Sequence, residues 1–390
     1  MRYAIITETY PPEINGVALT VQGLEQGLRA RGHVVELVRP AQVDENAAIA
    51  ECVTPQSDLT VVRGLPIPRY PNLRFGLPCA KKLRSLWTAT RPDAIYIATE
   101  GPLGNSALAI ANELGIPVIT GFHTRFDHYV VDYGFGFLRK TAIAWMRRFH
   151  NRADMTLVPT LELRRELASL GFKNVQCLRR AVDCQRFDPA KRSASLRTSW
   201  GLGREDLAVL FVGRIASEKN LELAVDAFRA LQRHRPDARF IWIGDGPRRE
   251  ELEEANGDFI FTGMLRGDEL AEAIASTDLF PFASSSETFG NVTLEAMASG
   301  VPVVAFDYGA AREFLRRNIH GDVVAMDDES AFIAATTRLA LEDTLRREMG
   351  ISCRRAMQAL QPEQVAEDLD SLFHQLIDRG SEHANVALAQ

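Results

Sequence analysis

Residues 284–300, SSSETFGNVTLEAMASG, lead from a short apolar run at 279–282 through a polar loop into a helix. The apolar positions from Val292 to Met297 predict a buried helix face, and Gly300 ends the helix. A strand that passes through a tight turn into a helix is the building unit of a parallel α/β sheet. Free backbone N–H groups at a helix start favour anions, so the turn at 289–292 is a candidate site for a diphosphate.

Two glutamates flank this turn. Glu287 precedes it and can accept hydrogen bonds from sugar hydroxyls, whereas Glu295 lies about two helical turns further on and can accept a pair from ribose hydroxyls. Together they are typical of a clamp for a nucleotide-sugar. Taken alone, the stretch is explained equally well as a capped surface helix with two solvated glutamates.

Two cations follow another predicted strand. The apolar run 207–212 is succeeded by GRIASEKN, which places Arg214 and Lys219 on the turn between a strand and a helix. Ligands bind at the carboxyl ends of the strands in an open α/β sheet, so we expect both cations to face the same crevice as Glu287. Fixed cations there can neutralise a leaving diphosphate. The alternative is two exposed cations on a loop.

A third junction of this kind lies near the N-terminus. A strand at 3–7 is followed by a turn and then by a helix to about residue 31, and Gly16 stands where this helix begins. A residue without Cβ lets a ligand phosphate approach the backbone closely. Asn-Gly is also an ordinary turn dipeptide, so a purely structural turn is the alternative.

Short apolar strands alternate with helical patterns along the chain. The predicted strands are 3–7, 34–38, 95–98, 118–122, 156–159, 207–212, 240–243, 259–261, 279–282 and 301–306. This alternation predicts an α/β protein with two doubly wound parallel sheets, in two Rossmann-like domains that face a central crevice. We expect these domains over 1–185 and 186–361, a helix over 362–379 and a frayed tail over 380–390.

The order and spacing of several motifs resemble those of the retaining glycosyltransferases of family four, which have the GT-B fold. The motifs are Glu287-x7-Glu295, Gly213-Arg214 with Glu218-Lys219, Gly121-Phe-His123, Arg180-Ala-Val-Asp183, Gly244-Asp-Gly-Pro247, Phe261-Thr-Gly263 and Gly300-Val-Pro-Val-Val-Ala305. The likeness covers nearly the whole chain. It is strongest for bacterial GDP-mannose-dependent α-mannosyltransferases and for sulfoquinovosyl-diacylglycerol synthases, which use a UDP-sugar, so the donor base stays open.

The resemblance implies roles for individual residues. The implied catalytic residues are Glu287, Arg214, Lys219 and His123. The implied donor-binding residues are Gly16, Arg214, Lys219, Gly263, Met264, Glu287, Phe289, Gly290, Asn291, Val292 and Glu295. His123 follows the strand at 118–122, from which its imidazole would hydrogen-bond a donor hydroxyl; a satisfied structural histidine is the alternative.

The resemblance also assigns the domains. It implies that the N-terminal domain binds the acceptor, that the C-terminal domain binds the nucleotide-sugar, and that the helix at 362–379 crosses back to the first domain. Acceptor loops such as 66–78 contain no residue pattern that identifies the acceptor, and neither Asp127 nor His128 has a defined role. Two positions depart from the family: Ala181 stands where relatives often have Gly, and Gly309-Ala310 replaces a frequent Gly-Gly.

Composition limits the partners. With 390 residues, 46% hydrophobic and 25% charged, the chain is an ordinary two-domain globular protein, and its net charge of −6 gives no support for a nucleic-acid partner. The five cysteines contain no C-x-x-C pair, so a reducing cytoplasm fits best. The start of the chain lacks a signal-peptide core, and no apolar run approaches a spanning helix, so we expect any membrane contact to be peripheral, at the inner face.

No metal or cofactor is expected beyond the nucleotide-sugar, which is a co-substrate. The dense acidic triplet at 327–329 precedes a helix, where carboxylates favour the helix dipole, so capping explains it better than metal binding does. The resemblance likewise implies that cations and backbone N–H groups, not an obligatory metal, position the diphosphate.

A basic helix is predicted over 137–150, FLRKTAIAWMRRFH. Four cations, Arg139, Lys140, Arg147 and Arg148, are interleaved with apolar residues, so the helix can rest on an anionic membrane with Trp145, Met146 and Phe149 in the interface. A core-packed helix with a basic solvated face explains the pattern as well.

We therefore predict a retaining hexosyltransferase. It would move a mannosyl group from GDP-mannose, or a glucosyl-type group from a UDP-sugar, to a hydroxyl of a lipid-linked or glycan acceptor. A nicotinamide oxidoreductase is disfavoured because Gly244-Asp-Gly246-Pro-Arg-Arg breaks the G-x-G-x-x-G fingerprint at its last position. A catalytically silent sugar-nucleotide-binding protein is the remaining alternative.

Overall fold

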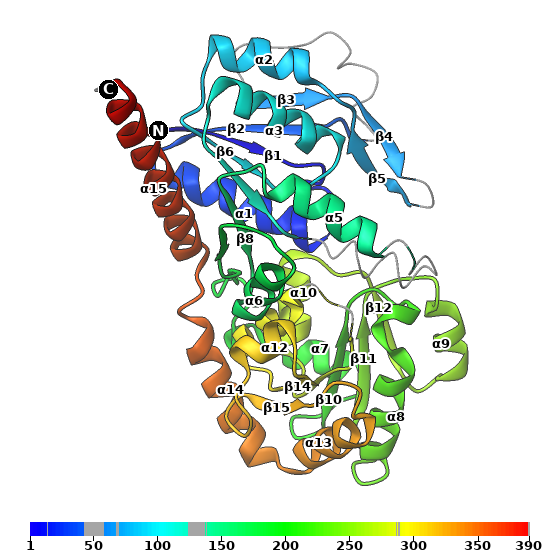
Figure 1. The fold of residues 1–390 in the computed structure, drawn as a ribbon. Coiled ribbons are helices and arrows are strands. Elements are labelled where there is room, and N and C mark those ends of the chain that lie inside the picture. Colours follow the sequence, from blue (N-terminus) through cyan, green and yellow to red (C-terminus); the bar gives the residue numbers. More distant parts are fainter. Residues whose placement is uncertain are drawn as a thin grey trace. The chain divides into compact units, whose positions relative to one another are not determined.

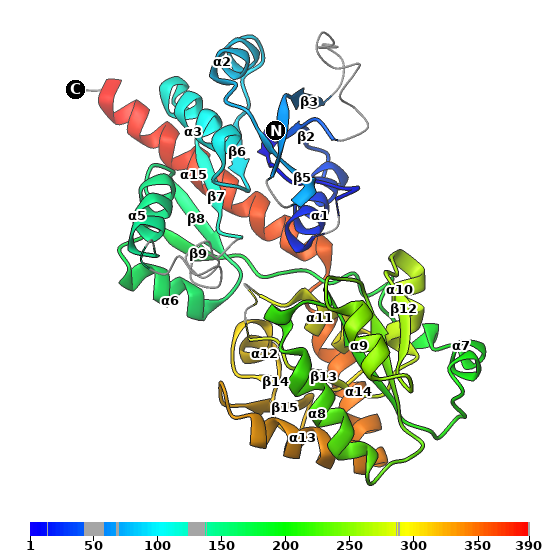
Figure 2. The same cartoon turned by 90° about the vertical axis from the view of Figure 1, so that its right-hand side faces the viewer.

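The protein forms two compact units. The structure is a computed structural model that describes residues 1–13, 15–42, 58–67, 70–123, 137, 139–285, 287 and 289–388. Unit 1 contains Met1–Ala181 and Pro362–Gln390, and unit 2 contains Val182–Gln361. Each unit is a parallel sheet with helices on both faces (Figures 1 and 2).

Unit 1 is built on a seven-stranded parallel sheet. Its strand order is β3-β2-β1-β6-β7-β8-β9. The strands are β1 (Arg2–Ile6), β2 (Val34–Pro40), β3 (Leu59–Val62), β6 (Ala94–Ile97), β7 (Val118–Gly121), β8 (Met155–Val158) and β9 (Val175–Cys177). In the central register, Tyr3 of β1 is paired with Val35 of β2 and Ala94 of β6. The segment 66–78, expected as a loop, belongs largely to an antiparallel ribbon of β4 (Gly64–Ile67) and β5 (Tyr70–Gly76).

Helices cover both faces of this sheet. They are α1 (Gly16–Ala30), α2 (Ala80–Ala89), α3 (Pro102–Leu114), α5 (Arg139–His150), α6 (Leu161–Ser169) and α15 (Pro362–Leu388). Side chains alternate along β1, so Tyr3 and Ile5 lie in a core cluster with α1 and α15, whereas Ala4 and Ile6 lie in another with α2 and α3.

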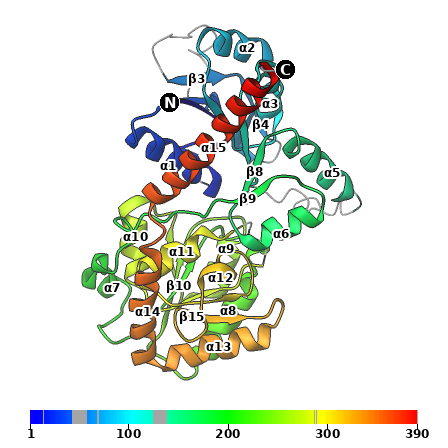
Figure 3. The same cartoon turned by 60° about the vertical axis from the view of Figure 1, so that its left-hand side comes forward.

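The last helix of the chain packs in unit 1. Figures 1 and 3 show α15 alongside α1, and Val365, Leu369 and Phe373 of α15 lie in the same buried cluster as β1. Asp370 of α15 accepts hydrogen bonds from the Tyr3 hydroxyl at 2.7 Å and from Arg31 Nε at 3.2 Å. The helix continues to Leu388, beyond the predicted end at 379.

Unit 2 repeats the architecture with six parallel strands. They are β10 (Ala208–Val212), β11 (Arg239–Ile243), β12 (Ile260–Gly263), β13 (Phe280–Phe282), β14 (Val303–Phe306) and β15 (Gly321–Val324). Two three-stranded sheets, β10-β11-β12 and β13-β14-β15, meet where Leu210 N donates to Leu279 O at 2.8 Å. The resulting order, β12-β11-β10-β13-β14-β15, reverses direction between β10 and β13, where an open α/β sheet binds its ligand.

Apolar side chains on the two faces of β10 pack against two layers of helices. The helices of unit 2 are α7 (Ala194–Ser199), α8 (Leu221–Gln232), α9 (Arg249–Ala255), α10 (Gly267–Ala275), α11 (Asn291–Ala298), α12 (Gly309–Phe314), α13 (Glu329–Leu341) and α14 (Asp343–Met357). Val209 and Phe211 pack with α8 and α13, whereas Ala208 and Leu210 pack with α10, α11 and α14. The sheet is therefore buried on both sides, and sheets of this kind bind their ligands at the carboxyl ends of the strands.

The predicted fold class is confirmed. Each of the ten predicted strands overlaps an observed strand, and both sheets are parallel. Besides the ribbon of β4 and β5, the sequence missed β3, β9 and β15, which are short edge strands with polar residues in them.

Candidate functional site

The turns after β10 and β11 lie against each other, backbone to backbone. Gly213 N donates to Ile243 O at 3.0 Å, and a Cβ on Gly244 would lie 1.9 Å from Gly213 O. A Cβ on Gly246 would lie 2.3 Å from Ile215 O. The two motif glycines are therefore required for this close approach, which fixes the backbone that carries Arg214.

Lys219 and Glu287 form the centre of the site in unit 2. Lys219 ends a 3-10 turn, Ser217–Lys219, after β10, and Glu287 lies on the loop after β13. Lys219 Nζ donates to Glu287 Oε1, and both side chains are mostly buried. Ser284 Oγ also lies 3.3 Å from this carboxylate oxygen. The strand-end rule thus brought together two residues that are far apart in sequence, as predicted.

Arg214 extends from the same turn as Lys219. Its Nη1 atom lies 3.3 Å from Glu218 Oε1, and nearly half of the side chain is exposed. The exposed guanidinium is therefore accessible to an anion, and its weak hydration favours ion pairing.

The start of α11 provides a second anion-binding element. Gly290 occupies the N-cap position with φ 90°, a left-handed conformation that favours glycine, and provides no side-chain cap. Phe289 is buried in the core beneath the turn, while Asn291 and Val292 are partly exposed at the first helical positions. A helix start without a side-chain cap leaves backbone N–H groups that can bind an oxyanion.

Glu295 projects from α11 and is mostly buried. Within the described residues its side-chain carboxylate makes no hydrogen bond or ion pair. Burial raises the pKa of the Glu295 carboxyl to about 7, and the charge of Arg186 opposes this shift. A buried carboxylate without a partner costs free energy, so it is poised to accept hydrogen bonds from a ligand.

Gly263 and Met264 lie at the end of β12. Gly263 has φ 74°, and its carbonyl accepts a hydrogen bond from Gly244 N at 2.9 Å, so β12 ends beside the same pair of turns. Met264 is 53% exposed, and Arg266 Nη2 lies 3.7 Å from its sulfur. This exposed apolar side chain can pack against a flat ring such as a nucleobase.

In unit 1 the helix that begins at Gly16 is capped by its own sequence. The side chain of Asn15 accepts hydrogen bonds from Val17 N at 3.1 Å and from Ala18 N at 2.8 Å. Asn15 Nδ2 in turn donates to Thr9 Oγ1 at 2.6 Å. A phosphate at this helix start would therefore meet the backbone of Gly16 itself, because Asn15 occupies the next two N–H groups.

His123 lies at the carboxyl end of β7 in unit 1, but both of its ring nitrogens are engaged. Arg180 Nη2 donates to Nδ1 at 2.6 Å, so the neutral ring carries its proton on Nε2, which lies 2.8 Å from the Tyr96 hydroxyl. Burial, together with the charges of Arg180 and His150, holds the pKa of His123 well below its ordinary value. The predicted hydrogen bond to a donor hydroxyl requires that Nε2 exchange Tyr96 for the ligand.

A second buried histidine was not predicted from the sequence. His150 of α5 lies between Glu100 and Thr120, with Nε2 3.1 Å from Glu100 Oε1 and Nδ1 2.8 Å from Thr120 Oγ1. Glu100 follows β6, and its carboxylate is almost fully buried. No local motif marks this pair, because its members are 50 residues apart.

The basic helix α5 differs in part from its prediction. The prediction that Met146 and Phe149 enter a membrane interface is wrong, because both side chains are buried in the core of unit 1. Trp145 is 45% exposed and Phe137 is 78% exposed. We call the four exposed cations of this helix, Arg139, Lys140, Arg147 and Arg148, the basic face.

The acidic triplet at 327–329 caps a helix. Asp328 is the N-cap of α13 and accepts a hydrogen bond from Ala331 N at 3.0 Å, which confirms the capping interpretation. Among the described residues, no cluster of three or more His, Cys, Asp or Glu side chains is arranged to hold a metal. In that same part of the chain, no helix is long and apolar enough to cross a bilayer. Asp127 and His128 lie outside the described residues.

The likeness to solved structures gives the class of protein. Sucrose-phosphate synthase from Thermosynechococcus elongatus matches with a TM-score of 0.77 and 19% identity, over 97% of this chain and 99% of that one. With two parallel-sheet units, this likeness places the chain in the GT-B fold, which confirms the predicted fold class.

The family follows from sequence. Residues 14–186 match the model "Glycosyltransferase Family 4", and residues 206–342 match "Glycosyl transferases group 1". A GDP-mannose-dependent alpha-mannosyltransferase of Mycolicibacterium smegmatis is 34% identical over 98% of this chain and 99% of its own length. The chain belongs to the family-four glycosyltransferases, so it is an enzyme that transfers a sugar from a nucleotide-sugar.

Two further relatives bear on the choice of substrate. Sulfoquinovosyl transferase SQD2 of Arabidopsis thaliana is 37% identical over 66% of this chain and 51% of its own length. An alpha-monoglucosyldiacylglycerol synthase of Streptococcus pneumoniae is 28% identical over 78% of this chain and 71% of its own length.

Proposed function

We propose that the protein is a retaining hexosyltransferase that moves a mannosyl group from GDP-mannose, or a glucosyl-type group from a UDP-sugar, to a hydroxyl of a lipid-linked acceptor. The observation that carries the donor side of this proposal is the contact between Lys219 and Glu287. It joins a cation suited to the diphosphate with a carboxylate suited to the sugar, as a nucleotide-sugar requires.

In this proposal the free enzyme keeps its two functional charges paired. Lys219 and Glu287 neutralise each other while the site is empty. An incoming diphosphate offers Lys219 a stronger anion and leaves Glu287 able to accept hydrogen bonds from the sugar hydroxyls. Arg214 and the start of α11 bind the remaining diphosphate charge, and Glu295 accepts hydrogen bonds from the ribose.

The chemical step follows from these positions. In this proposal Glu287 accepts hydrogen bonds from the sugar hydroxyls, and so orients the sugar, but does not attack it. The departing phosphate accepts the proton of the acceptor hydroxyl, and the new glycosidic bond forms on the face that the phosphate leaves. Stabilisation of the leaving diphosphate then accounts for most of the rate enhancement.

The acceptor side rests on unit 1. The relatives include a GDP-mannose-dependent alpha-mannosyltransferase and an alpha-monoglucosyldiacylglycerol synthase, which support a mannosyl donor and a lipid acceptor respectively. The basic face of α5 supports the lipid, since exposed cations beside exposed Trp145 and Phe137 suit an anionic membrane surface. The enzyme would then work at the inner face of the cytoplasmic membrane.

A nucleotide-release screen tests the proposal. GDP-, UDP- and ADP-sugars are incubated with the enzyme, with and without vesicles that contain diacylglycerol. Acceptor-dependent release of GDP from GDP-mannose is expected, and the Glu287→Gln variant should release GDP at a reduced but measurable rate. Binding of a nucleotide-sugar without release under any condition would favour a catalytically silent binding protein, and release of UDP alone would move the donor to a UDP-sugar.

A further inference from the structure

Tyr308 lies directly behind the Glu287 loop. It follows β14 and immediately precedes α12, and its ring packs against the apolar core of unit 2. Its hydroxyl donates to the carbonyl of Ser284 at 2.7 Å and lies 3.3 Å from the backbone nitrogen of Glu287, from which it accepts. One phenol thus connects the backbone on both sides of the loop turn that presents the Glu287 carboxylate.

The two residues after Tyr308 reinforce the same loop. Ala310 N donates to Phe289 O at 2.8 Å, and a Cβ on Gly309 would lie 2.6 Å from that carbonyl. Gly309 has φ 54°, so it needs to be glycine, whereas Ala310 tolerates its methyl group in a buried helical position. The Gly309-Ala310 departure from the family pattern therefore leaves this contact intact, and residues 308–310 hold the backbone at Ser284, Glu287 and Phe289.

The hydroxyl of Tyr308 is suited to a permanent structural bond. Burial, and then the negative charge of Glu287, raise the pKa of this phenol, so it stays protonated and keeps its donor proton. The hydroxyl both donates and accepts, so its two hydrogen bonds hold the backbone in one conformation without any change of charge.

We propose that Tyr308 is a positioning residue for the transferred sugar: its hydroxyl fixes the loop that aims Glu287, and it does not serve the nucleotide. This inference rests on the proposed role of Glu287 as the carboxylate that orients the sugar. Enzymes lose rate when a substrate-orienting group is misplaced by a fraction of an ångström, even where binding elsewhere is intact.

The test is the Tyr308→Phe variant, which keeps the ring and its packing and removes only the hydroxyl. We expect kcat/KM for the nucleotide-sugar to fall roughly tenfold, as the loss of one or two hydrogen bonds predicts. The affinity for the free nucleoside diphosphate, measured by calorimetry with GDP and UDP, should change less than about twofold. Tyr3→Phe is the matched control, since it removes a buried hydroxyl bonded to Asp370 in unit 1 and should leave both quantities unchanged.

A double-mutant cycle with Glu287→Gln identifies the route of the effect. If Tyr308 acts through Glu287, adding Tyr308→Phe to the Glu287→Gln variant should cost less than about twofold. A further tenfold loss, or an equal loss of nucleoside diphosphate affinity in the single variant, would overturn the positioning role. Wild-type turnover separates the two proposals: an active wild type with an unimpaired Tyr308→Phe variant refutes this inference alone, whereas a wild type that turns over no nucleotide-sugar refutes the proposed function and this inference with it.

Discussion

Replacing Glu295 by Gln should make the protein more stable and its nucleotide binding weaker. Burial raises the pKa of this carboxyl from its ordinary value of 4.5 to about 7 in the folded state, although the charge of Arg186 opposes the shift. The native state therefore holds the proton more tightly than the unfolded chain does. The contribution of Glu295 to the free energy of unfolding is therefore most favourable below pH 4.5. It decreases as the pH rises from 4.5 to 7, and it is constant above that range.

The magnitude follows from the size of the shift. A difference of about 2.5 pKa units corresponds to about 3 kcal/mol of unfolding free energy at pH 8. Glu295→Gln removes the charge and should raise the free energy of unfolding by up to that amount at pH 8 and by almost nothing at pH 4. Thermal or denaturant unfolding at the two pH values measures the change.

The same substitution should weaken nucleotide binding, and this effect should also be largest at high pH, where the wild-type carboxyl is ionised. At pH 8 the ionised Glu295 accepts charge-assisted hydrogen bonds from ribose, so its loss should cost about 1.5–3 kcal/mol, or roughly 10- to 100-fold in Kd. At pH 5.5 only about 3% of the wild-type carboxyl is ionised, so the ratio of the variant Kd to the wild-type Kd should fall from roughly 10- to 100-fold to about 1.3- to 4-fold. Calorimetry with GDP and with UDP measures the Kd of the variant and of the wild type at each pH. The titration of the diphosphate affects both Kd values equally and cancels in their ratio.

Three results would refute this reasoning. A Kd ratio that does not change between pH 5.5 and 8 would mean that Glu295 does not bind ribose as a carboxylate. A variant less stable than the wild type at pH 8 would mean that the carboxylate has a stabilising partner. Glu287→Gln is the matched control, and equal weakening of free nucleotide binding in that variant would refute the division of roles between the two glutamates.

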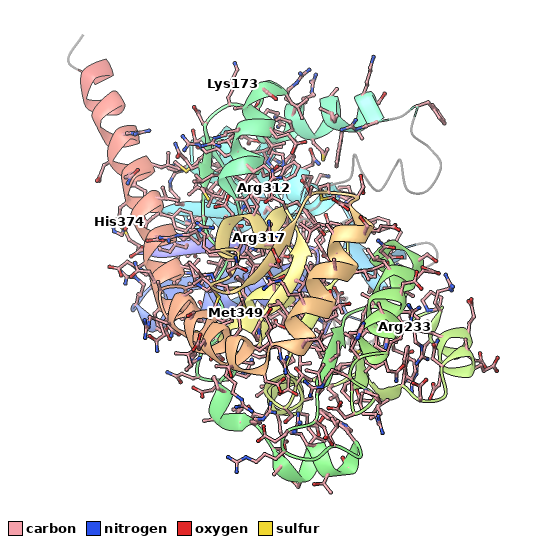
Figure 4. The ribbon with its side chains drawn as sticks, turned by 90° about the horizontal axis from the view of Figure 1, so that it is seen from below. Lys173, Arg233, Arg312, Arg317, Met349 and His374 are labelled. Carbon is pink, nitrogen blue, oxygen red and sulfur yellow. The ribbon has the colours of Figure 1, made fainter. Side chains whose placement is uncertain are left out.

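Three further predictions concern charge. Arg214→Ala should lower turnover about 100-fold with little change in melting temperature, because it removes a cation from the leaving diphosphate, and near-normal turnover would exclude it from the mechanism. Changing the basic face of α5 to Ser should abolish low-salt binding to anionic vesicles at about 1 kcal/mol per cation, whereas a control with four exposed cations of unit 2 changed should bind like wild type in the same cosedimentation assay. Those control positions are Arg204, Arg233 (labelled in Figure 4), Arg347 and Arg355. Asp370→Ala should lower the unfolding free energy by about 2 kcal/mol at pH 7. Burial acts to raise the pKa of Asp370, but hydrogen bonds from Tyr3 and His33 outweigh it and lower this pKa. The loss of stability should therefore disappear as the pH falls below the ordinary Asp pKa of about 3.9. An unchanged denaturation curve at pH 7 would show that this contact does not hold α15.

The sequence predicted the sheets well because buried parallel strands are continuous apolar runs. The run at 207–212 and the motif after it placed β10 and its turn correctly, and the strand-end rule brought Lys219 to Glu287. The strand β9, Val-Gln-Cys, was missed because three residues with a polar centre carry no periodic signal.

The parts of the site that were not predicted depend on contacts distant in sequence. His123 sits at a strand end as expected, but its bonds to Tyr96 and Arg180 span 27 and 57 residues, and they decide which ring nitrogen carries the proton. Tyr308 lies 21 residues from Glu287 and belongs to no motif that was recognised. Residue types alone could not reveal either set of partners.

The path of the chain dictates an order of folding. All residues of unit 2 are contiguous, whereas unit 1 is interrupted by them and is completed only by α15. On the ribosome, the face of the first sheet that later packs against Val365, Leu369 and Phe373 therefore stays uncovered until the whole of unit 2 has been synthesised. The later-encoded unit can thus mature before the earlier one, and a circular permutant that joins residues 362–388 ahead of residue 1 would reverse that order without altering either core.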